Sequence, residues 1–204
     1  MFIRTKPLPR RYNKNKKRLY FGTIKSNSMK ASIQPFSKAE TRILPIFYSY
    51  ADSPFARICL ASTEKGLCSV SLVMGTDAQS LVELQKKFPE ATFVNLFKPE
   101  HADFLKALEK KPVDLNFHLM GTSFQLDVWK ALLNIPFGGT TTYGALAAEI
   151  GRPKAFRAVG SAVGDNPIFY AVPCHRVLPA SGGVGNYYWG PEIKKALLDW
   201  EKAI

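Results

Sequence analysis

The chain has 204 residues, and hydrophobic residues make up 46% of it, the share found in an ordinary globular protein. The formal net charge of +12 suggests a negatively charged partner, but its distribution narrows that idea. Residues 1–39 hold eleven Lys and Arg and no acidic residue, whereas the other 17 basic residues are matched by 16 acidic ones. Contact with nucleic acid beyond residue 39 therefore depends on where individual basic side chains lie.

The sequence excludes several classes of protein. Its longest apolar runs, such as Ile43 to Tyr50 with Pro45 inside, are far shorter than the roughly 18 residues of a membrane span. Three cysteines without close pairing make neither a disulfide framework nor a four-cysteine zinc site. We therefore expect a reducing compartment: the cytoplasm in a bacterium, the nucleus in a eukaryote. His101 and His118 lack further ligands at suitable spacing, so we expect no metal and no other cofactor.

Residues 1–40 predict a basic, disordered extension. Such a segment can add sequence-independent affinity for phosphates, act as a targeting or nuclear signal, or be a passenger that precedes a later start at Met29. The sequence leaves these alternatives open. Its basic residues alternate with Asn and Tyr and include Arg10, Arg11, Lys14, Lys16, Lys17 and Arg18.

Residues 43–119 predict a small α+β domain. Apolar residues alternate as in strands as far as about residue 72, and the turn at residues 63–66 predicts a hairpin. Apolar residues then recur at helical spacing. Cys59 and Cys68 lie within the alternating stretches and are interpreted as small buried side chains. The expected elements are strands over 56–62, 67–73 and 91–97, helices over 77–88 and 101–109, and a connector over 110–120 with a strand-like stretch over 113–119.

Residues 120–204 predict a mostly helical second domain, with helices over 124–133, 143–150 and 154–163. The last two are short and are joined by a turn containing Gly151, the pattern of a helix-turn-helix of winged-helix type. Small residues in the helix over 154–163 allow close approach, either to a neighbouring helix or to DNA. Arg157 among them favours DNA.

The string Pro173-Cys174-His175-Arg176-Val177 places a thiol beside an imidazole and a guanidinium. A free cysteine with a pKa of about 8.5 is only a few per cent thiolate at neutral pH, so a neighbouring base or cation is the usual means of activation. Cys174 is therefore a candidate nucleophile. By itself, the string also fits a packed and inert thiol.

Four features of the second half occur together in one order. They are Phe124-Gln125-x-x-Val128-Trp129, the helix start Tyr143-Gly144, Arg157-Ala158-Val159-Gly160 followed by Asn166-Pro167, and the string around Cys174. Together they resemble the O6-alkylguanine-DNA alkyltransferases, also called methylated-DNA-protein-cysteine methyltransferases. The resemblance covers about residues 121–201, and residues 48–120 resemble the N-terminal domain of the family more loosely.

The resemblance implies DNA repair by direct transfer of an alkyl group, typically methyl, from O6 of guanine to Cys174, with O4 of thymine as a further possible substrate. Attack on an sp3 carbon requires a soft nucleophile, and thiolate is the best a protein has. By resemblance, His175 removes the thiol proton through a water, Glu201 orients the imidazole, and Tyr143 directs its phenol at N3 of the base. The thioether product is stable, so each molecule is expected to act once.

The resemblance also implies how the damaged base is held. Main-chain carbonyls of Cys174 and Val177 and the amide of Tyr188 recognise the flipped guanine. Many relatives have Ser-Gly-Gly where this chain has Tyr188-Trp189-Gly190. We expect Trp189 to narrow the pocket and to disfavour bulky alkyl groups.

The DNA contacts implied by the resemblance come from the helix over 154–163. Arg157 enters the base stack in place of the flipped nucleotide. Ala158 and Gly160 let the helix approach the minor groove of double-stranded DNA, and Asn166 ties this helix to the active-site turn. We expect a monomer, with no membrane partner.

Two other functions fit parts of the sequence. Alkyltransferase-like proteins bind damaged bases and recruit other repair factors but have lost the cysteine, so the presence of Cys174 counts against that role. A cysteine hydrolase would normally carry its histidine far along the chain from the nucleophile, unlike His175.

Overall fold

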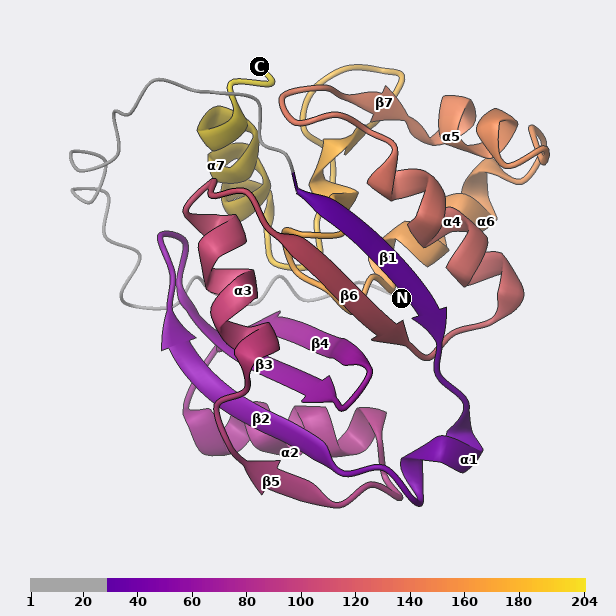
Figure 1. Cartoon of the computed structure of the whole chain (residues 1–204). Coiled ribbons are helices and arrows are strands. Elements are labelled where there is room, and N and C mark those ends of the chain that lie inside the picture. The colour runs from indigo at the N-terminus through magenta and orange to yellow at the C-terminus, as the bar shows by residue number, and fades with distance from the viewer. Residues whose placement is uncertain (1–28) are drawn as a thin grey trace.

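The computed structural model describes residues 29–204 (Figure 1). It has the expected α+β class, with a mixed six-stranded sheet followed by a largely helical part. The strand order in the sheet is β1-β6-β4-β3-β2-β5. The strands are β1 (Lys30–Pro35), β2 (Ile46–Asp52), β3 (Arg57–Thr63), β4 (Gly66–Leu72), β5 (Phe93–Asn95) and β6 (Asp114–Leu119).

The predicted hairpin is confirmed as β3 and β4, which pair in antiparallel fashion. Alternation along β3 sends Ile58 and Leu60 to one face of the sheet and Cys59 and Ala61 to the other. Helix α3 (Pro99–Leu108) packs with the first pair and helix α2 (Asp77–Lys87) with the second. Both faces of the sheet are therefore covered. Cys59 and Cys68 are buried as expected, and burial raises the pKa of both thiols.

Part of the expected basic extension is ordered, which corrects the boundary at residue 40. β1 pairs in parallel with β6 along its whole length, and α1 (Lys38–Thr41) follows it. The reason is that β6 would otherwise leave an edge of unpaired backbone groups, while Ala31 and Ile33 pack against the core. Residues 1–28, which carry most of the basic charge of the expected extension, lie outside the described residues.

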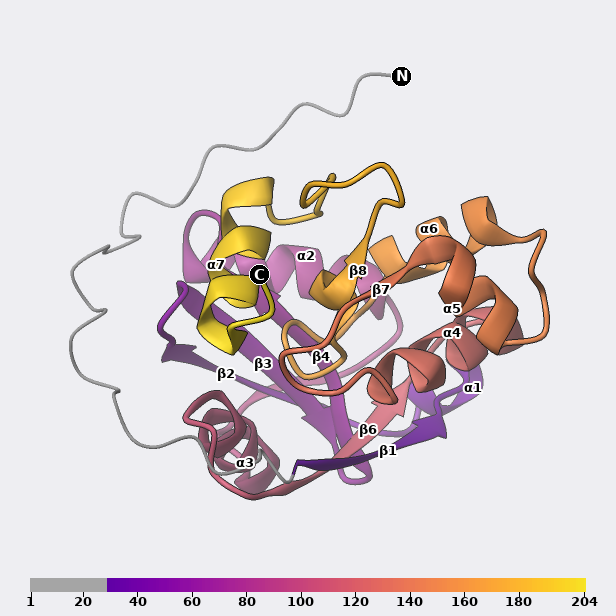
Figure 2. The ribbon, with the colours of Figure 1, turned by 90° about the horizontal axis from the view of Figure 1, so that it is seen from above.

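The second half contains the three predicted helices and a fourth that the sequence analysis did not predict. α4 begins with a capping box in which Thr122 and Gln125 exchange side-chain and main-chain hydrogen bonds. α4, α5 and α6 gather at one end of the sheet, and α7 lies apart from them (Figures 1 and 2). The bounds are α4 (Ser123–Leu133), α5 (Tyr143–Glu149), α6 (Phe156–Gly164) and α7 (Pro191–Glu201).

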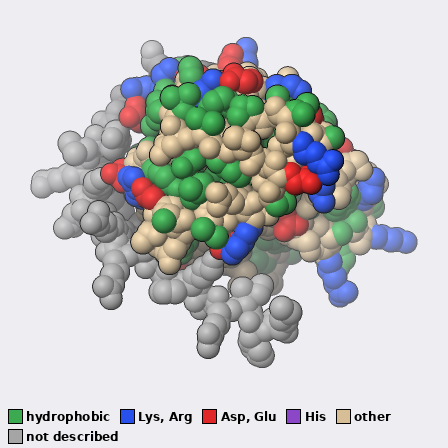
Figure 3. Space-filling view, turned by 90° about the horizontal axis from the view of Figure 1, so that it is seen from below, with side chains coloured by type: hydrophobic (Ala, Val, Ile, Leu, Met, Phe, Trp, Pro, Cys, Tyr) green, Lys and Arg blue, Asp and Glu red, His purple; other side chains and the backbone are tan. Residues whose placement is uncertain are grey.

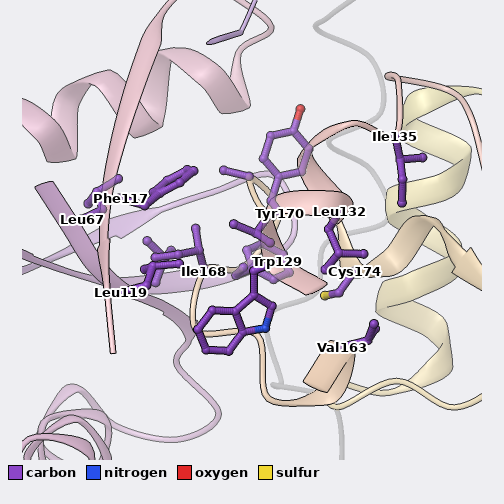
Figure 4. Close-up of a cluster of buried hydrophobic side chains, with 14 of the residues drawn as sticks. Leu67, Phe117, Leu119, Trp129, Leu132, Ile135, Val163, Ile168, Tyr170 and Cys174 are labelled. Atoms are coloured by element: carbon purple, nitrogen blue, oxygen red, sulfur yellow. The ribbon is translucent and has the colours of Figure 1, made fainter. Parts of the chain in front are cut away.

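One hydrophobic core joins the sheet to the helical part (Figure 4). Trp129 of α4 lies between residues of the sheet and Cys174, and its indole donates to the carbonyl of Ala162 at 2.8 Å. The segment before Cys174 also bonds to β4, because Val70 donates to Pro167 at 2.9 Å and accepts from Phe169 at 2.9 Å. The segment that leads to Cys174 is thus anchored on the sheet.

Hydrophobic side chains gather at the end of the molecule at which Figure 1 places α1, α2 and β5. Figure 3 views this end from below and shows these side chains in patches, with scattered Lys and Arg and scattered Asp and Glu around them. Phosphate binding calls for concentrated positive charge, so this end is poorly suited to it. Large exposed hydrophobic residues on these elements and the segments beside them are Ile43, Val82, Val94, Leu96 and Phe97. Of the helices in the described part of the chain, none has the length and apolar character that crossing a membrane requires.

Candidate active site

Cys174 opens a short 3-10 turn, Cys174–Arg176, which continues into β8 (Val177–Leu178). β8 pairs in parallel with β7 (Thr141–Thr142), and α5 follows β7 directly. Thr142 caps α5 by accepting a hydrogen bond from Ala145 at 3.2 Å. This two-stranded ladder brings the start of α5, with Tyr143, to the turn that carries the thiol.

Cys174 is 8% exposed as a residue, and its thiol has two side-chain partners. Asn166 donates from Nδ2 to Sγ at 3.1 Å, and Sγ donates to the hydroxyl of Tyr187 at 3.7 Å. Burial raises the pKa of Cys174 more than these hydrogen bonds lower it. The thiol therefore keeps its proton at neutral pH and needs a base before it can attack.

His175 provides a buried imidazole next to this thiol in the chain. Its Nε2 lies 2.9 Å from Oε1 of Glu201, and both side chains are fully buried. Burial lowers the pKa of His175, against the opposing effect of the Glu201 hydrogen bond, so the ring is neutral at pH 7. With Nε2–H donated to Glu201, Nδ1 is left as a buried acceptor without a hydrogen-bond partner among the described residues. A neutral ring with a free lone pair can accept a proton.

Glu201 is held in place by Arg176 as well as by His175. The guanidinium of Arg176 donates from Nε to Oε2 at 2.8 Å and from Nη2 to Oε1 at 2.9 Å, and it also donates to the carbonyl of Ile135. Burial raises the pKa of Glu201, but the hydrogen bonds from His175 and Arg176 outweigh it and lower the pKa to about 2. Glu201 is therefore a carboxylate that fixes the imidazole.

Asn166 links the end of α6 to the active-site turn. Its Nδ2 donates to the carbonyls of Ile168 at 3.0 Å and Val172 at 2.7 Å, and its Oδ1 accepts from the amide of Ile168 at 2.9 Å. Together with the bond to Cys174, one side chain meets four groups of the segment that leads to the thiol. A shift of α6 would therefore be transmitted to that segment.

Tyr143 and the face of α6 lie together. Burial raises the pKa of Tyr143, and the neighbouring Cys174 acts in the same direction, so the phenol keeps its proton. A Cβ built on Gly160 would lie 3.7 Å from the Tyr143 ring, which places this predicted DNA-binding residue partly against the ring. Arg157 and Ala158, by contrast, are exposed.

The residues predicted to hold the flipped guanine or to narrow its pocket differ in exposure. Tyr188 is 66% exposed and makes an edge contact with Trp189 at a centroid distance of 4.6 Å. Val177 is fully buried, and its carbonyl, predicted to bind guanine, accepts a hydrogen bond from Lys194 at 2.7 Å. A carbonyl oxygen has two lone pairs, so the contact with Lys194 does not by itself occupy both of them.

No role was predicted for Tyr187 or Lys194, and Arg176 was considered only as a cation beside the thiol, not as a partner of Glu201. Lys194 is 1% exposed, and burial lowers its pKa to about 8, against the opposing effect of Cys174. A signal for it was present, because Lys194 falls on the otherwise apolar stripe of α7 that includes Leu197 and Leu198. In residues 29–204, no group of three His, Cys, Asp or Glu side chains could hold a metal ion.

These features define a class: a protein with a buried cysteine and an adjacent histidine-carboxylate pair, on a scaffold that pairs a mixed sheet with a helical second half. The sequence model of the 6-O-methylguanine DNA methyltransferase DNA-binding domain matches residues 123–203, and that of the ribonuclease-like domain of the same enzyme matches residues 46–120. The chain belongs to the 6-O-methylguanine DNA methyltransferase family.

The names of proteins that are similar to this chain agree with its place in this family. A methylated-DNA-protein-cysteine methyltransferase of Methanosarcina acetivorans is 41% identical over 160 residues, which cover 76% of this chain and 98% of that protein. The bifunctional transcriptional activator and DNA repair enzyme Ada of Escherichia coli is 38% identical over 160 residues, but these span only 45% of its length. The Mycobacterium tuberculosis O6-methylguanine methyltransferase structure has a TM-score of 0.63 at 37% identity, covering 78% of this chain and 93% of that one. A second structure of the M. tuberculosis protein, in complex with DNA, has the same TM-score and identity, covering 77% and 93%.

Proposed function

We propose that Cys174 is the residue that accepts the alkyl group and that His175 and Glu201 activate it. Family membership carries the activity itself: the protein repairs DNA by transferring an alkyl group from the damaged base to one of its own cysteines. The observation that supports Cys174 is its place beside a neutral, buried imidazole whose Nε2 lies 2.9 Å from a carboxylate. Cys59 and Cys68 have no such base beside them in the chain.

In the proposed reaction, the alkyl carbon exchanges its bond to O6 of guanine for a bond to the sulfur of Cys174. His175 takes the thiol proton, through a water, and the thiolate attacks the carbon bound to O6 of guanine. The bond between sulfur and carbon forms as the bond between carbon and O6 breaks, and the electron pair stays on the guanine. Tyr143, still protonated, gives its proton to N3 of the departing base, and the proton held by His175 returns through water to the Tyr143 oxygen, so the products are a thioether and a neutral guanine. The thioether on Cys174 has no hydrolytic exit, so each molecule acts once.

DNA recognition is assigned to α5 and α6, which we propose form a helix-turn-helix of winged type. The turn that joins the two helices carries two basic residues, Arg152 and Lys154, which with Pro153 and Ala155 line a shallow, open depression. Exposed Arg157 is proposed to fill the position of the flipped nucleotide from the minor groove, with Ala158 and Gly160 allowing close approach. The protein is proposed to act as a monomer.

Peptide mapping tests this function. The protein is incubated with a duplex oligonucleotide that contains one O6-methylguanine, and the cysteine peptides are then weighed by mass spectrometry. The expected result is one added methyl on Cys174 and none on Cys59 or Cys68, with no transfer in Cys174→Ser. Tight binding without any added methyl would contradict the proposal and would instead indicate a protein that binds damage and recruits others. An O4-methylthymine duplex, run in parallel, tests the second substrate.

A further inference from the structure

One exposed aromatic residue on α6 has no role in the reaction described above. Phe156 begins the helix and is 49% exposed, although the helix has a well-formed buried side. Isolated exposed hydrophobic residues are common, but an aromatic ring next to a proposed DNA-contacting arginine is well placed to meet the same partner. The buried side consists of Val159, Ala162 and Val163.

The exposed side of α6 is otherwise built of small residues. Helical spacing groups Phe156 and Arg157 with Gly160, Ser161 and Gly164, so only the first two project far from the helix. Packing does not demand a small residue at Gly164, because a Cβ there would meet nothing within 4 Å. The first turn of the helix therefore carries two large side chains, and a flat surface follows them.

The two large side chains lie together. The guanidinium carbon of Arg157 is 5.8 Å from the centroid of the Phe156 ring, within the range of a cation-π contact. Their neighbours towards the N-terminus include the exposed basic residues Arg152 and Lys154, which line a shallow depression before α6. The pair is thus close in the chain to two cations that can meet phosphates, and its own two groups are both suited to stacking on bases.

We propose that Phe156 and Arg157 form a two-residue wedge, in which the Phe156 ring presses into the base stack beside the position that Arg157 occupies. The inference rests on the proposed function, since it concerns how the damaged nucleotide leaves the duplex. Proteins that bind the minor groove often insert an apolar side chain between base steps and unstack them. The small residues behind the wedge let the helix come close enough for the ring to reach the step. Phe156 is then a specificity-determining residue for duplex substrates.

The test compares duplex and single-stranded DNA, because only the duplex has a stack to open. Phe156→Ala and Phe156→Leu are measured with O6-methylguanine in both forms of one oligonucleotide, with the rate of methyl transfer to Cys174 as the readout. Phe97→Ala is the matched control, because Phe97 is 51% exposed at the opposite end of the molecule. Thermal unfolding verifies that each variant is folded.

Loss of one base-stacking contact predicts that Phe156→Ala slows repair of the duplex about tenfold or more, whereas repair of the single strand changes by less than about twofold. Phe156→Leu should fall between Phe156→Ala and the wild type on the duplex, and Phe97→Ala should match the wild type. If Phe156→Ala slows methyl transfer equally on duplex and single-stranded DNA, or on neither, the proposal that Phe156 acts as a wedge is wrong. A duplex with 2-aminopurine at the target position separates the two proposals. Its fluorescence reports base flipping even if Cys174 accepts no methyl, and an unchanged signal in Phe156→Ala would reject the wedge alone.

Discussion

Replacing Glu201 with Gln tests whether the buried carboxylate that accepts a hydrogen bond from His175 supports stability and methyl transfer. The substitution keeps the size of the side chain but removes its charge, and the guanidinium of Arg176 is then left buried without a carboxylate. Gln can still accept a hydrogen bond from His175, so the change isolates the charge more than the shape. We expect a folded but less stable protein with slower transfer to Cys174.

The expected size of the effect follows from burial and pKa. Removing one partner of a buried ion pair typically costs about 3–5 kcal/mol. The pKa of Glu201 is about 2 in the folded protein. Unfolded glutamate has a pKa of about 4.3, and this difference of roughly two units corresponds to about 3 kcal/mol at neutral pH. Because the folded pKa is the lower one, the stabilisation is complete above about pH 4.3 and disappears as the pH falls towards 2.

Urea unfolding at several pH values measures this effect. The free energy of unfolding of wild type and Glu201→Gln should differ by about 3 kcal/mol at pH 7, and the difference should shrink below about pH 4.3. Asp199→Asn is the matched control on α7, because its ion pair with Lys195 is exposed and worth less than about 1 kcal/mol. A Glu201→Gln cost equal to that of the control, or one independent of pH, would refute the role given to this carboxylate.

Three further predictions concern the reaction and its support. His175→Ala should slow methyl transfer by about a hundredfold or more. In the wild type, the rate of methyl transfer should not change with pH above about pH 6.5 and should fall only in more acidic solution, because burial lowers the pKa of His175. A single-turnover rate profile checks both, and a wild-type rate that drops between pH 8 and 7 would argue against a neutral imidazole. Trp189→Ala should raise the rate of repair of O6-benzylguanine relative to that of O6-methylguanine in the same duplex. If the ratio of the two rates is the same in the variant and the wild type, Trp189 does not narrow the pocket. Asn166→Ala should lower stability by about 2 kcal/mol, because the buried amide of Ile168 loses its acceptor, and it should also slow transfer. Thermal unfolding that matches the wild type would contradict this.

The secondary-structure elements that were predicted correctly are those that a local sequence pattern specifies. The hairpin of β3 and β4 and the helices α4, α5 and α6 follow from apolar spacing and turn residues within a few positions of one another. β1 was missed because its six residues lie within residues 1–39, which hold eleven basic residues and no acidic one, and because its partner is distant. The side chain of Ser32 bonds to Asn116, 84 residues further along the chain. No local pattern reports a parallel pairing over that distance.

The sequence by itself determined which chemical groups are present and in what order. Cys174 beside His175, with Tyr143 and Arg157 at their spacing, was enough to indicate the reaction and its family. Only the tertiary structure decided which groups meet and in which protonation state. Glu201, 26 residues from His175, reaches it because α7 packs against the active-site turn. Burial then keeps the thiol protonated, the imidazole neutral and the carboxylate charged, because a pKa depends on desolvation and nearby partners, which exist only once the chain has folded.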